Sequence, residues 1–393
     1  MKNKIMKKQK ICIIGGGLTG LITATVLSKL NVKIDLITGK NNQNLTSNRT
    51  TAISQDNFNF LRHLKIINNA KINFWSCTKM KLYTESKENK FNEIFQIKKE
   101  KNPNEKILYM INNNQVIKNL LKKIKKEKLI NIISKKNVSK IVSRGLLKSL
   151  KFNNIDKSKY NLIIDCAGNN SRLSRSNFES EVYKRSYEEV AVTTIVQHNK
   201  SKNDTARQIF FDNEIFALLP ISNTKTSIVW SIKKQKKINE IVFRKKINSY
   251  INFFLDNAKI ISRIECRNLN LLIRKKYYED RVLLFGDALH LAHPLAGQGF
   301  NMILRDLIDL EKIIKNKINL GLDVGSSDIL KEFSNETKPR NFVYLMGIDF
   351  LKNSFSANNK SFKYFRNFVI SNLNKNNLAK DFVYNIANKG FRF

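Results

Sequence analysis

Hydrophobic positions near the start of the chain alternate between two periods. Ile11–Ile14 is a short apolar run, glycines follow it, and Leu18–Leu30 then carries apolar residues at helical spacing. After a turn at Asn31, Val32–Ile37 again has the composition of a strand. A strand, a helix and a second strand in this order predict a βαβ unit with a parallel strand pair.

The middle of the chain has a different pattern, in which short alternating runs are typical of antiparallel sheet. The strands expected from these runs are Lys79–Tyr83, Phe95–Ile97, Val190–Gln197, Gln208–Phe211, Phe216–Pro220 and Ser227–Ile232. Two further segments, Val116–Leu129 and Lys245–Asp256, are expected helices. This part of the chain therefore predicts a sheet of a second kind.

Buried parallel strands return on either side of the antiparallel runs. Leu162–Ile164 and Val282–Phe285 are short apolar strands, and Gly297–Leu320 is a long helix with one apolar stripe. From Lys338 onward the chain is helical and aromatic. We therefore predict an α/β (α+β) fold, in which a discontinuous Rossmann-like domain encloses an inserted antiparallel sheet domain and a helical segment follows.

The charge balance and the N-terminal segment each suggest a membrane or a polyanion. The chain has 71 Lys and Arg against 32 Asp and Glu, a formal net charge of +39. The lysines are spread along the chain without a nucleic-acid-binding motif, so no nucleic acid is expected; an anionic membrane surface and an AT-rich genome both remain compatible with them. The uncharged stretch Ile11–Ser28 follows a basic segment, but its glycines argue against a signal peptide or a membrane anchor.

Cysteine and histidine spacing gives no metal site. The cysteines are widely spaced, without a C-x-x-C pair, which excludes a zinc ribbon and a disulfide framework and fits a reducing cytoplasm: Cys12, Cys77, Cys166 and Cys266. His290 and His293 are three residues apart, but no third ligand has matching spacing. No metal is expected.

The first motif with chemical meaning is Gly15-x-Gly17-x-x-Gly20, between the first strand and its helix. Gly15 permits a tight turn, Gly17 lacks the Cβ that would block a pyrophosphate, and Gly20 allows close packing. Backbone N–H groups at the helix start then attract phosphates. The acidic residue that usually ends the second strand is replaced by Thr38, because Asp35 lies inside the strand.

The second motif begins after the strand Val282–Phe285. Gly286-Asp287-Ala288 places a carboxylate at the C-terminal end of that strand, where it can accept hydrogen bonds from ribityl hydroxyls. The glycine-rich start of the next helix can stabilise negative charge on a reduced flavin ring. Together the two motifs predict a flavin dinucleotide.

The second motif also carries a family resemblance. From Gly286 to Asn301 it runs Gly-Asp-Ala-x-His-x-x-His-Pro-x-Ala-Gly-Gln-Gly-Phe-Asn, and Arg305-Asp306 follow. This resembles the signature of the ubiquinone-biosynthesis flavin hydroxylases, in the para-hydroxybenzoate hydroxylase-like superfamily. The resemblance covers essentially the whole chain, with further similar stretches at Arg49–Ser54, Gly168–Ser171 and Phe216–Pro220.

The resemblance implies that the cofactor is FAD. Its ADP part would be bound by the first glycine motif, Arg49 would lie near the phosphates or the ribityl chain, and Gly286 and Asp287 would hold the ribityl group. Thr38, in place of the usual acidic residue, can still make one hydrogen bond to the adenosine ribose through its hydroxyl. The residues expected to line the isoalloxazine ring are Pro294, Gly297, Gln298, Gly299 and Asn301. No side chain is assigned as catalytic.

The pattern of elements along the chain also predicts domain limits. The FAD-binding domain would comprise residues 1–72, 105–180 and 275–340, and the substrate-binding sheet domain residues 73–104 and 181–274. Residues 341–393 would form the C-terminal helical segment.

The implied reaction is hydroxylation of the aromatic ring of a polyprenylated phenol or quinone precursor in ubiquinone biosynthesis. It would proceed through a flavin C4a-hydroperoxide, with NAD(P)H or another electron donor as reductant. Because the polyprenyl tail of this substrate is insoluble, we expect a cytoplasmic protein that binds the inner membrane peripherally through its basic and aromatic residues.

Three other functions stay open: a polyprenyl reductase, a halogenase, and a catalytically idle flavin-binding subunit of a quinone-biosynthesis complex. The idle subunit is favoured by departures from the family pattern at Thr38, at Ala167 in place of an aspartate, and at Ile303 in place of a glycine.

Overall fold

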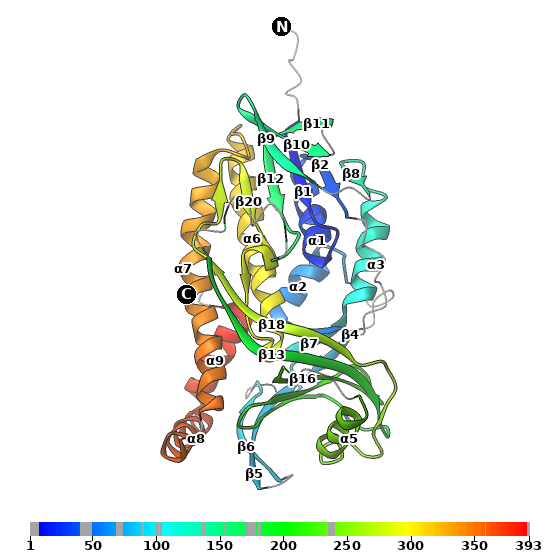
Figure 1. Ribbon diagram of the computed structural model, residues 1–393, viewed down its shortest axis with the longest axis vertical. Coiled ribbons are helices and arrows are strands. Elements are labelled where there is room, and N and C mark those ends of the chain that lie inside the picture. Colours follow the sequence, from blue (N-terminus) through cyan, green and yellow to red (C-terminus); the bar gives the residue numbers. More distant parts are fainter. Residues whose placement is uncertain are drawn as a thin grey trace.

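A computed structural model describes most of the chain (Figure 1). The described residues are 8–39, 49–67, 74–87, 90–99, 102, 104–134, 138–152, 155–169, 171, 178, 182–234, 240–357 and 359–390. The domain limits predicted near residues 72 and 180 lie outside these ranges, as does most of the polar stretch that precedes Arg49.

A six-stranded sheet forms the upper part of the molecule in Figure 1. Its strands, in spatial order, are β19 (Tyr278–Glu279), β20 (Val282–Leu284), β12 (Leu162–Asp165), β1 (Lys10–Ile14), β2 (Lys33–Ile37) and β8 (Ile130–Ile133). All neighbours are parallel except β19 and β20. The central strands are almost entirely apolar because helices cover both faces of a parallel sheet.

The predicted βαβ unit is present. Helix α1 (Leu18–Leu27) connects β1 to β2 and is buried from Gly20 onward, so its apolar residues do not form a single stripe. The helix ends in a 3-10 turn, Ser28–Leu30, and Asn31 has φ +58° at the start of the turn into β2. Helices α3 (Asn113–Ile124) and α6 (Gln298–Asn319) complete the packing around this sheet.

A nine-stranded sheet forms the lower part of the molecule. Its strands, in spatial order, are β21 (His290–Leu291), β18 (Glu265–Arg274), β13 (Val182–Gln197), β16 (Lys225–Lys233), β15 (Ile215–Pro220), β14 (Thr205–Phe210), β5 (Lys79–Lys87) and β6 (Lys90–Ile97), with β17 (Lys259–Ile260) paired to β13. Only β14 and β5 pair in parallel. Helix α5 (Glu240–Ile251) packs on one face. The predicted α/β fold with an inserted antiparallel sheet is confirmed.

Two three-stranded sheets make up the rest of the β structure in the residues that the structure describes. One contains β3 (Thr50–Ser54), β7 (Leu108–Asn112) and β4 (Phe74–Cys77), and the other contains β9 (Lys140–Arg144), β10 (Leu147–Phe152) and β11 (Ile155–Tyr160). Helix α2 (Gln55–His63) follows β3 directly.

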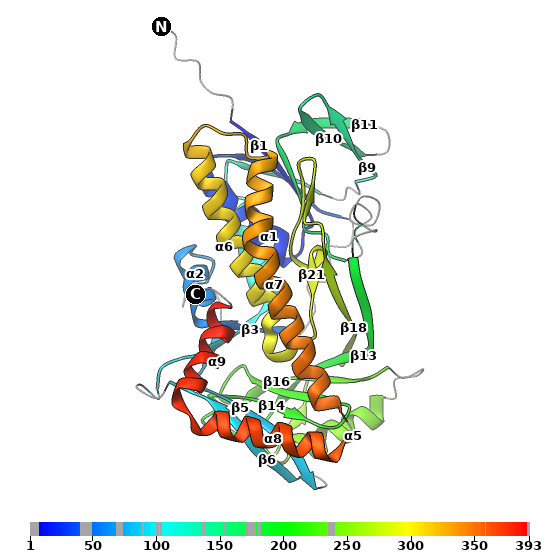
Figure 2. The same ribbon diagram turned by 90° about the vertical axis from the view of Figure 1, so that its left-hand side faces the viewer.

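Three helices form the last part of the chain that the structure describes (Figure 2). They are α7 (Ser327–Ser356), α8 (Lys360–Lys375) and α9 (Asn377–Lys389). Helix α7 lies beside α6 and runs from the six-stranded to the nine-stranded sheet, α8 crosses near β6, and α9 returns to α2. The predicted limit between residues 340 and 341 falls inside α7. None of the described helices is long and apolar enough to cross a membrane.

Candidate functional site

Three glycines shape the turn after β1, and their surroundings differ. Gly15 has φ +127°, and a Cβ there would lie 2.6 Å from the main-chain oxygen of Cys166. A Cβ at Gly20 would lie 1.9 Å from the oxygen of Gly15. Packing therefore requires glycine at both positions. A Cβ at Gly17 would instead meet nothing within 4 Å, so this residue borders open space.

The open space at Gly17 lies at the start of α1. Gly17 occupies the N-cap position; in the described part of the chain no side chain caps this helix, and its first turn contains no acidic residue. Helix-terminal N–H groups and the helix dipole bind anions. The local structure therefore suits a diphosphate.

The polar residue at the end of β2 is Thr38, as the sequence predicts. Its N–H donates to the carbonyl of Ile133 at 3.0 Å, and its side chain is buried. Asp35 lies inside the strand, where its carboxylate contacts Lys10 and the Tyr160 hydroxyl, each at 2.7 Å. Asp35 is thus engaged in contacts around the strand and does not take the place of the missing acidic residue.

The two sequence motifs meet in the structure. Gly286 has φ +66°, and a Cβ there would lie 2.5 Å from Cγ2 of Thr19 in the first turn of α1. Asp287 follows it in the 3-10 turn Gly286–Ala288, and its side chain is exposed. The carboxylate is therefore presented near the start of α1.

Arg49 and Asp287 lie within electrostatic reach of each other. Part of the Arg49 side chain is exposed to solvent. The protein atoms around it still desolvate its charge, which lowers its pKa, and the negative charge of Asp287 opposes that shift. An arginine beside an exposed carboxylate can bind both the phosphates and the hydroxyls of a dinucleotide. The structure thus brings together two residues that the sequence predicted from separate motifs.

The loop segment Pro294–Asn301, which comprises the turn before α6 and the first turn of that helix, contains the other predicted residues. Pro294 is half-buried and precedes the 3-10 turn Leu295–Gly297. Gly297 has φ +68°, and a Cβ there would lie 3.0 Å from the Cβ of Ala52. A Cβ at Gly299 would meet nothing within 4 Å. The loop therefore packs tightly against β3 at Gly297 and borders open space at Gly299.

Gln298 and Asn301 hold this loop through their amides. Asn301 is fully buried; its Oδ1 accepts hydrogen bonds from the Ser54 N–H at 2.9 Å and from Asn57 Nδ2 at 3.0 Å. Oε1 of Gln298 accepts a hydrogen bond from the Tyr344 hydroxyl. Both amides thus join the loop to other elements of the protein.

The fold accommodates two of the departures from the family pattern. Asp165 accepts hydrogen bonds from the N–H of Ala167 at 2.9 Å and from the hydroxyl of Ser171 at 2.6 Å, which fixes the turn after β12. Ile303 is buried in the hydrophobic core. The turn that contains Ala167 is thus held by Asp165, and Ile303 adds an apolar side chain to the core.

Each histidine of the second motif contacts its own carboxylate. His290 Nε2 lies 2.8 Å from Oδ2 of Asp306, and His293 Nε2 lies 3.2 Å from Oε2 of Glu189. Lys352 contacts the other oxygen of Glu189 at 2.6 Å. Among the described residues, no three His, Cys, Asp or Glu side chains are grouped to hold a metal ion. The pairing of His293 with Glu189 and Lys352 was not predicted from the sequence.

The motifs thus place helix-terminal N–H groups, an arginine and an exposed carboxylate around one edge of the parallel sheet, an arrangement that suits FAD. A family model described as an FAD binding domain matches residues 8–342. The chain belongs to this family. The predicted FAD cofactor is confirmed.

The FAD-binding chain is similar to ubiquinone-biosynthesis proteins. It is 26% identical to the mitochondrial ubiquinone biosynthesis monooxygenase COQ6 of Dictyostelium discoideum, over 96% of this chain and 90% of that protein. It is 27% identical to the ubiquinone hydroxylase UbiL of Rhodospirillum rubrum, over 50% of this chain and 46% of that protein.

The fold is that of known flavin monooxygenases. The p-nitrophenol 4-monooxygenase PnpA of Pseudomonas putida superposes with a TM-score of 0.78 at 15% identity, covering 98% of this chain and 99% of that one. HpxO of Klebsiella pneumoniae, in complex with FAD and uric acid, gives 0.76 at 12% identity, covering 98% and 97%. The prediction of an FAD-dependent monooxygenase is confirmed.

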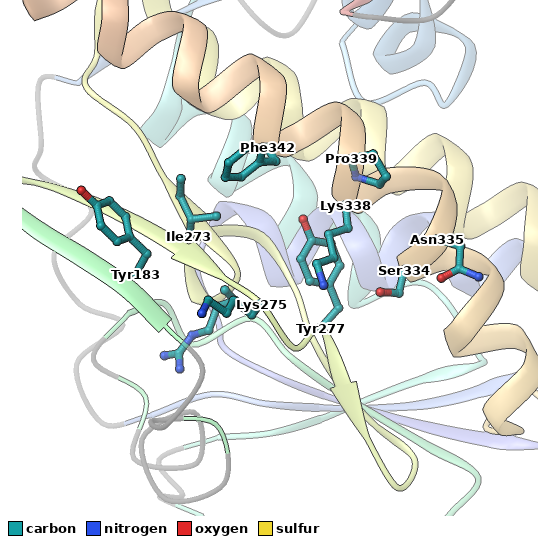
Figure 3. Close-up of a pocket in the computed structure, with 10 residues that line it drawn as sticks. Tyr183, Ile273, Lys275, Tyr277, Ser334, Asn335, Lys338, Pro339 and Phe342 are labelled. Atoms are coloured by element: carbon teal, nitrogen blue, oxygen red, sulfur yellow. The ribbon is translucent and has the colours of Figure 1, made fainter.

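A separate surface pocket of about 570 Å³ lies between α7 and the strands β13 and β18 (Figure 3). Tyr183 and Phe342 form apolar parts of its wall, and Lys275 and Lys338 add positive charge. None of the predicted FAD-binding residues lines this pocket.

Proposed function

We propose that this FAD-binding protein hydroxylates the aromatic ring of a polyprenylated phenol or quinone precursor in ubiquinone biosynthesis. The observation that carries the proposal is the similarity to COQ6, which extends over 96% of the chain. Reduced FAD supplies the activation of O2, and NAD(P)H or another electron donor supplies the electrons.

The chain itself binds and orients the cofactor in this proposal. The start of α1, open at Gly17, holds the diphosphate, with Thr38 beside it. Arg49 and Asp287 hold the phosphate and ribityl groups, and the Pro294–Asn301 loop borders the isoalloxazine ring. Gln298 and Asn301 act by fixing that loop, because their amides already contact protein.

We further propose that the protein acts at the surface of an anionic membrane, on its cytoplasmic side. Large apolar side chains are exposed on α7 and α8, and we call them the α7–α8 apolar surface: Phe342, Val343, Met346, Phe350, Leu351, Phe362, Tyr364, Phe365, Phe368, Val369 and Leu373. The net charge of +39 favours anionic lipid, and exposed aromatic residues favour the headgroup region. A substrate with an insoluble polyprenyl tail would be bound from the membrane at this surface.

The experiment is hydroxylation of a phenol with a short polyprenyl tail by the FAD-loaded protein under ¹⁸O₂. The bound FAD is reduced chemically, so that the experiment does not depend on knowing the natural electron donor. The expected product contains one ¹⁸O atom on its ring, detected by mass spectrometry. The control is Gly17→Val, which should not retain FAD.

Consumption of O2 without oxygen transfer to the ring would contradict the proposal and favour a catalytically idle subunit. Deleting the gene gives a second test, because the unhydroxylated quinone precursor should then accumulate. Membership of a biosynthetic complex would appear as co-purification with other enzymes of the same series.

A further inference from the structure

One buried histidine beside the Pro294–Asn301 segment, which we call the flavin loop, has a nitrogen without a hydrogen-bond partner among the described residues. His293 directly precedes Pro294 and is 1% exposed. Its Nε2 contacts Glu189, whereas its Nδ1 is buried and has no partner among the residues that the structure describes. Buried polar atoms are nearly always hydrogen-bonded, so an exception calls for a functional explanation.

Glu189 reaches His293 because β13 is irregular at this point. The pairing of β13 with β18 shifts between Ser186 and Glu189, and Glu188 has φ +52°. Such a bulge redirects the side chains that follow it. Glu189 is buried together with Lys352 of α7, whose Nζ lies 2.6 Å from Oε1. The carboxylate is thus held between α7 and the flavin loop.

The charge state of Glu189 determines the proton position on His293. Burial alone would raise the pKa of Glu189, but hydrogen bonds from His293 and Lys352 lower it overall, so the carboxylate is ionised. An ionised carboxylate only accepts hydrogen bonds, and Nε2 of His293 therefore carries the proton.

His293 is neutral near pH 7. Burial lowers its pKa, and the charge of Lys352 acts in the same direction, against the opposing effects of Glu189 and Asp349. Because Nε2 carries the only ring proton, Nδ1 has a bare lone pair. His293 directly precedes Pro294, the first of the residues expected along the isoalloxazine ring, so this nitrogen belongs to a side chain at the start of that segment.

We propose that Nδ1 of His293 accepts the proton of the substrate's phenolic hydroxyl, with Glu189 and Lys352 as positioning residues. This inference rests on the proposed function. The O–H bond of the phenol breaks and an N–H bond forms at Nδ1, so a neutral pair becomes a phenolate and an imidazolium. The imidazolium donates from Nε2 to Glu189, and the electron-rich phenolate ring is the better acceptor of an electrophilic oxygen. When the product forms, Nδ1 of His293 returns the proton to the phenolic oxygen.

The first test needs neither substrate nor turnover. The chain has 4 histidines, so ¹⁵N-labelled histidine gives few ring signals in the NMR spectrum of the FAD-loaded protein. His293 is identified by its loss in His293→Gln. At pH 7 its signals should show a protonated Nε2 and an unprotonated Nδ1, and protonation should occur only below the ordinary value of about 6.5. A protonated Nδ1 at pH 7 would overturn the proposal.

The second test separates the two ring nitrogens. In His293→Gln, the amide nitrogen can replace Nε2 and keep the contact with Glu189, but nothing replaces Nδ1. The matched control is His198→Gln, because His198 is also buried and both of its ring nitrogens have protein partners. The measurements are ultraviolet absorbance of bound farnesylphenol, which reports its ionisation, and the pH dependence of hydroxylation.

The expected result is that wild type and His198→Gln ionise the bound phenol and hydroxylate it. His293→Gln should retain FAD, bind the phenol un-ionised and hydroxylate it about 10² times more slowly, with the missing rate recovered as rising pH ionises the phenol. Equal ionisation and equal rates in His293→Gln would overturn the proposal and leave the proposed function intact. A wild-type protein that neither binds nor hydroxylates the phenol would overturn both.

Discussion

At the scale of single residues, substitutions at the three motif glycines should have different effects. Gly15 and Gly20 are tightly packed, whereas Gly17 borders open space. Gly17→Val is expected to abolish FAD binding, because the valine side chain would enter the open space at the start of α1. Gly347→Val is the matched control, since Gly347 also has nothing within 4 Å of its Cβ position but lies on α7. Fluorescence quenching of added FAD measures both. Equal FAD binding by the two variants would show that the turn has only a structural role.

Asp287 gives a second prediction at this scale. Asp287→Ala removes an exposed carboxylate, so the apo-protein melting temperature should be nearly unchanged while FAD binding weakens. The loss of a charge-assisted hydrogen bond corresponds to about 1.5–3 kcal/mol, or roughly ten- to hundredfold in Kd. Calorimetric titration with FAD measures the affinity. The assignment fails if Kd is unchanged and the melting temperature falls.

The sequence predicted the cofactor motifs, but it did not predict the buried polar contacts around His293. Glycine spacing predicts where a chain must turn or admit a phosphate, because the requirement is local. The partnership of His293, Glu189 and Lys352 joins three distant segments, and the bulge that aims Glu189 leaves no clear mark in the sequence. The sequence feature that could have indicated this bulge is the acidic pair Glu188–Glu189 at the start of an apolar run.

At the scale of elements, helix α3 shows why predicted boundaries shift. The sequence predicted Val116–Leu129, and the helix is Asn113–Ile124. It starts early because Asn112 caps it: the side chain accepts a hydrogen bond from the Gln115 N–H at 3.2 Å. Apolar periodicity locates the buried face of a helix, whereas its ends depend on such single contacts.

The cap on α3 makes a stability prediction. Asn112→Ala should lower the free energy of unfolding by about 1 kcal/mol, because one N–H group of the first turn loses its acceptor. Asn112→Asp should retain most of the stability, since a carboxylate accepts the same hydrogen bond and favours the helix N-terminus. Urea unfolding followed by circular dichroism measures both. If the two variants lose equal stability, the side-chain cap contributes nothing.

Short or polar strands were the elements that sequence reasoning missed. Strand β3, Thr50–Ser54, was noted only as a stretch similar to the family, and its pairing with β7 joins residues far apart in the chain. Strands β10 and β11 contain several lysines and serines, so their apolar alternation is weak. Their existence depends on pairing with neighbours.

At the scale of the whole molecule, the proposed membrane contact predicts a specific lipid dependence. The protein should sediment with vesicles rich in phosphatidylglycerol and less with pure phosphatidylcholine, and added salt should weaken the electrostatic part of the binding. Replacing Phe350 and Phe365 by serine should reduce binding, because these side chains are 68% and 63% exposed.

Leu146→Ser is the control for that experiment. Leu146 is 85% exposed but lies in the turn between β9 and β10, at the opposite end of the molecule from α8 in Figure 1. Its replacement should leave vesicle binding unchanged. If all the variants bind anionic vesicles equally, the interaction is due to general positive charge, and the α7–α8 apolar surface is not the contact.

The order of strands in the parallel sheet has a consequence for synthesis of the protein. Strand β12 lies between β1, near the N-terminus, and β20, which ends at Leu284. A chain emerging from the ribosome therefore carries β1 and β12 long before the strand that completes their sheet exists. Until then an apolar strand edge stays unpaired, and unpaired edges promote association between chains. The newly made protein is therefore expected to depend on chaperones that shield this edge, and a truncation before β20 should yield aggregates instead of a smaller flavoprotein.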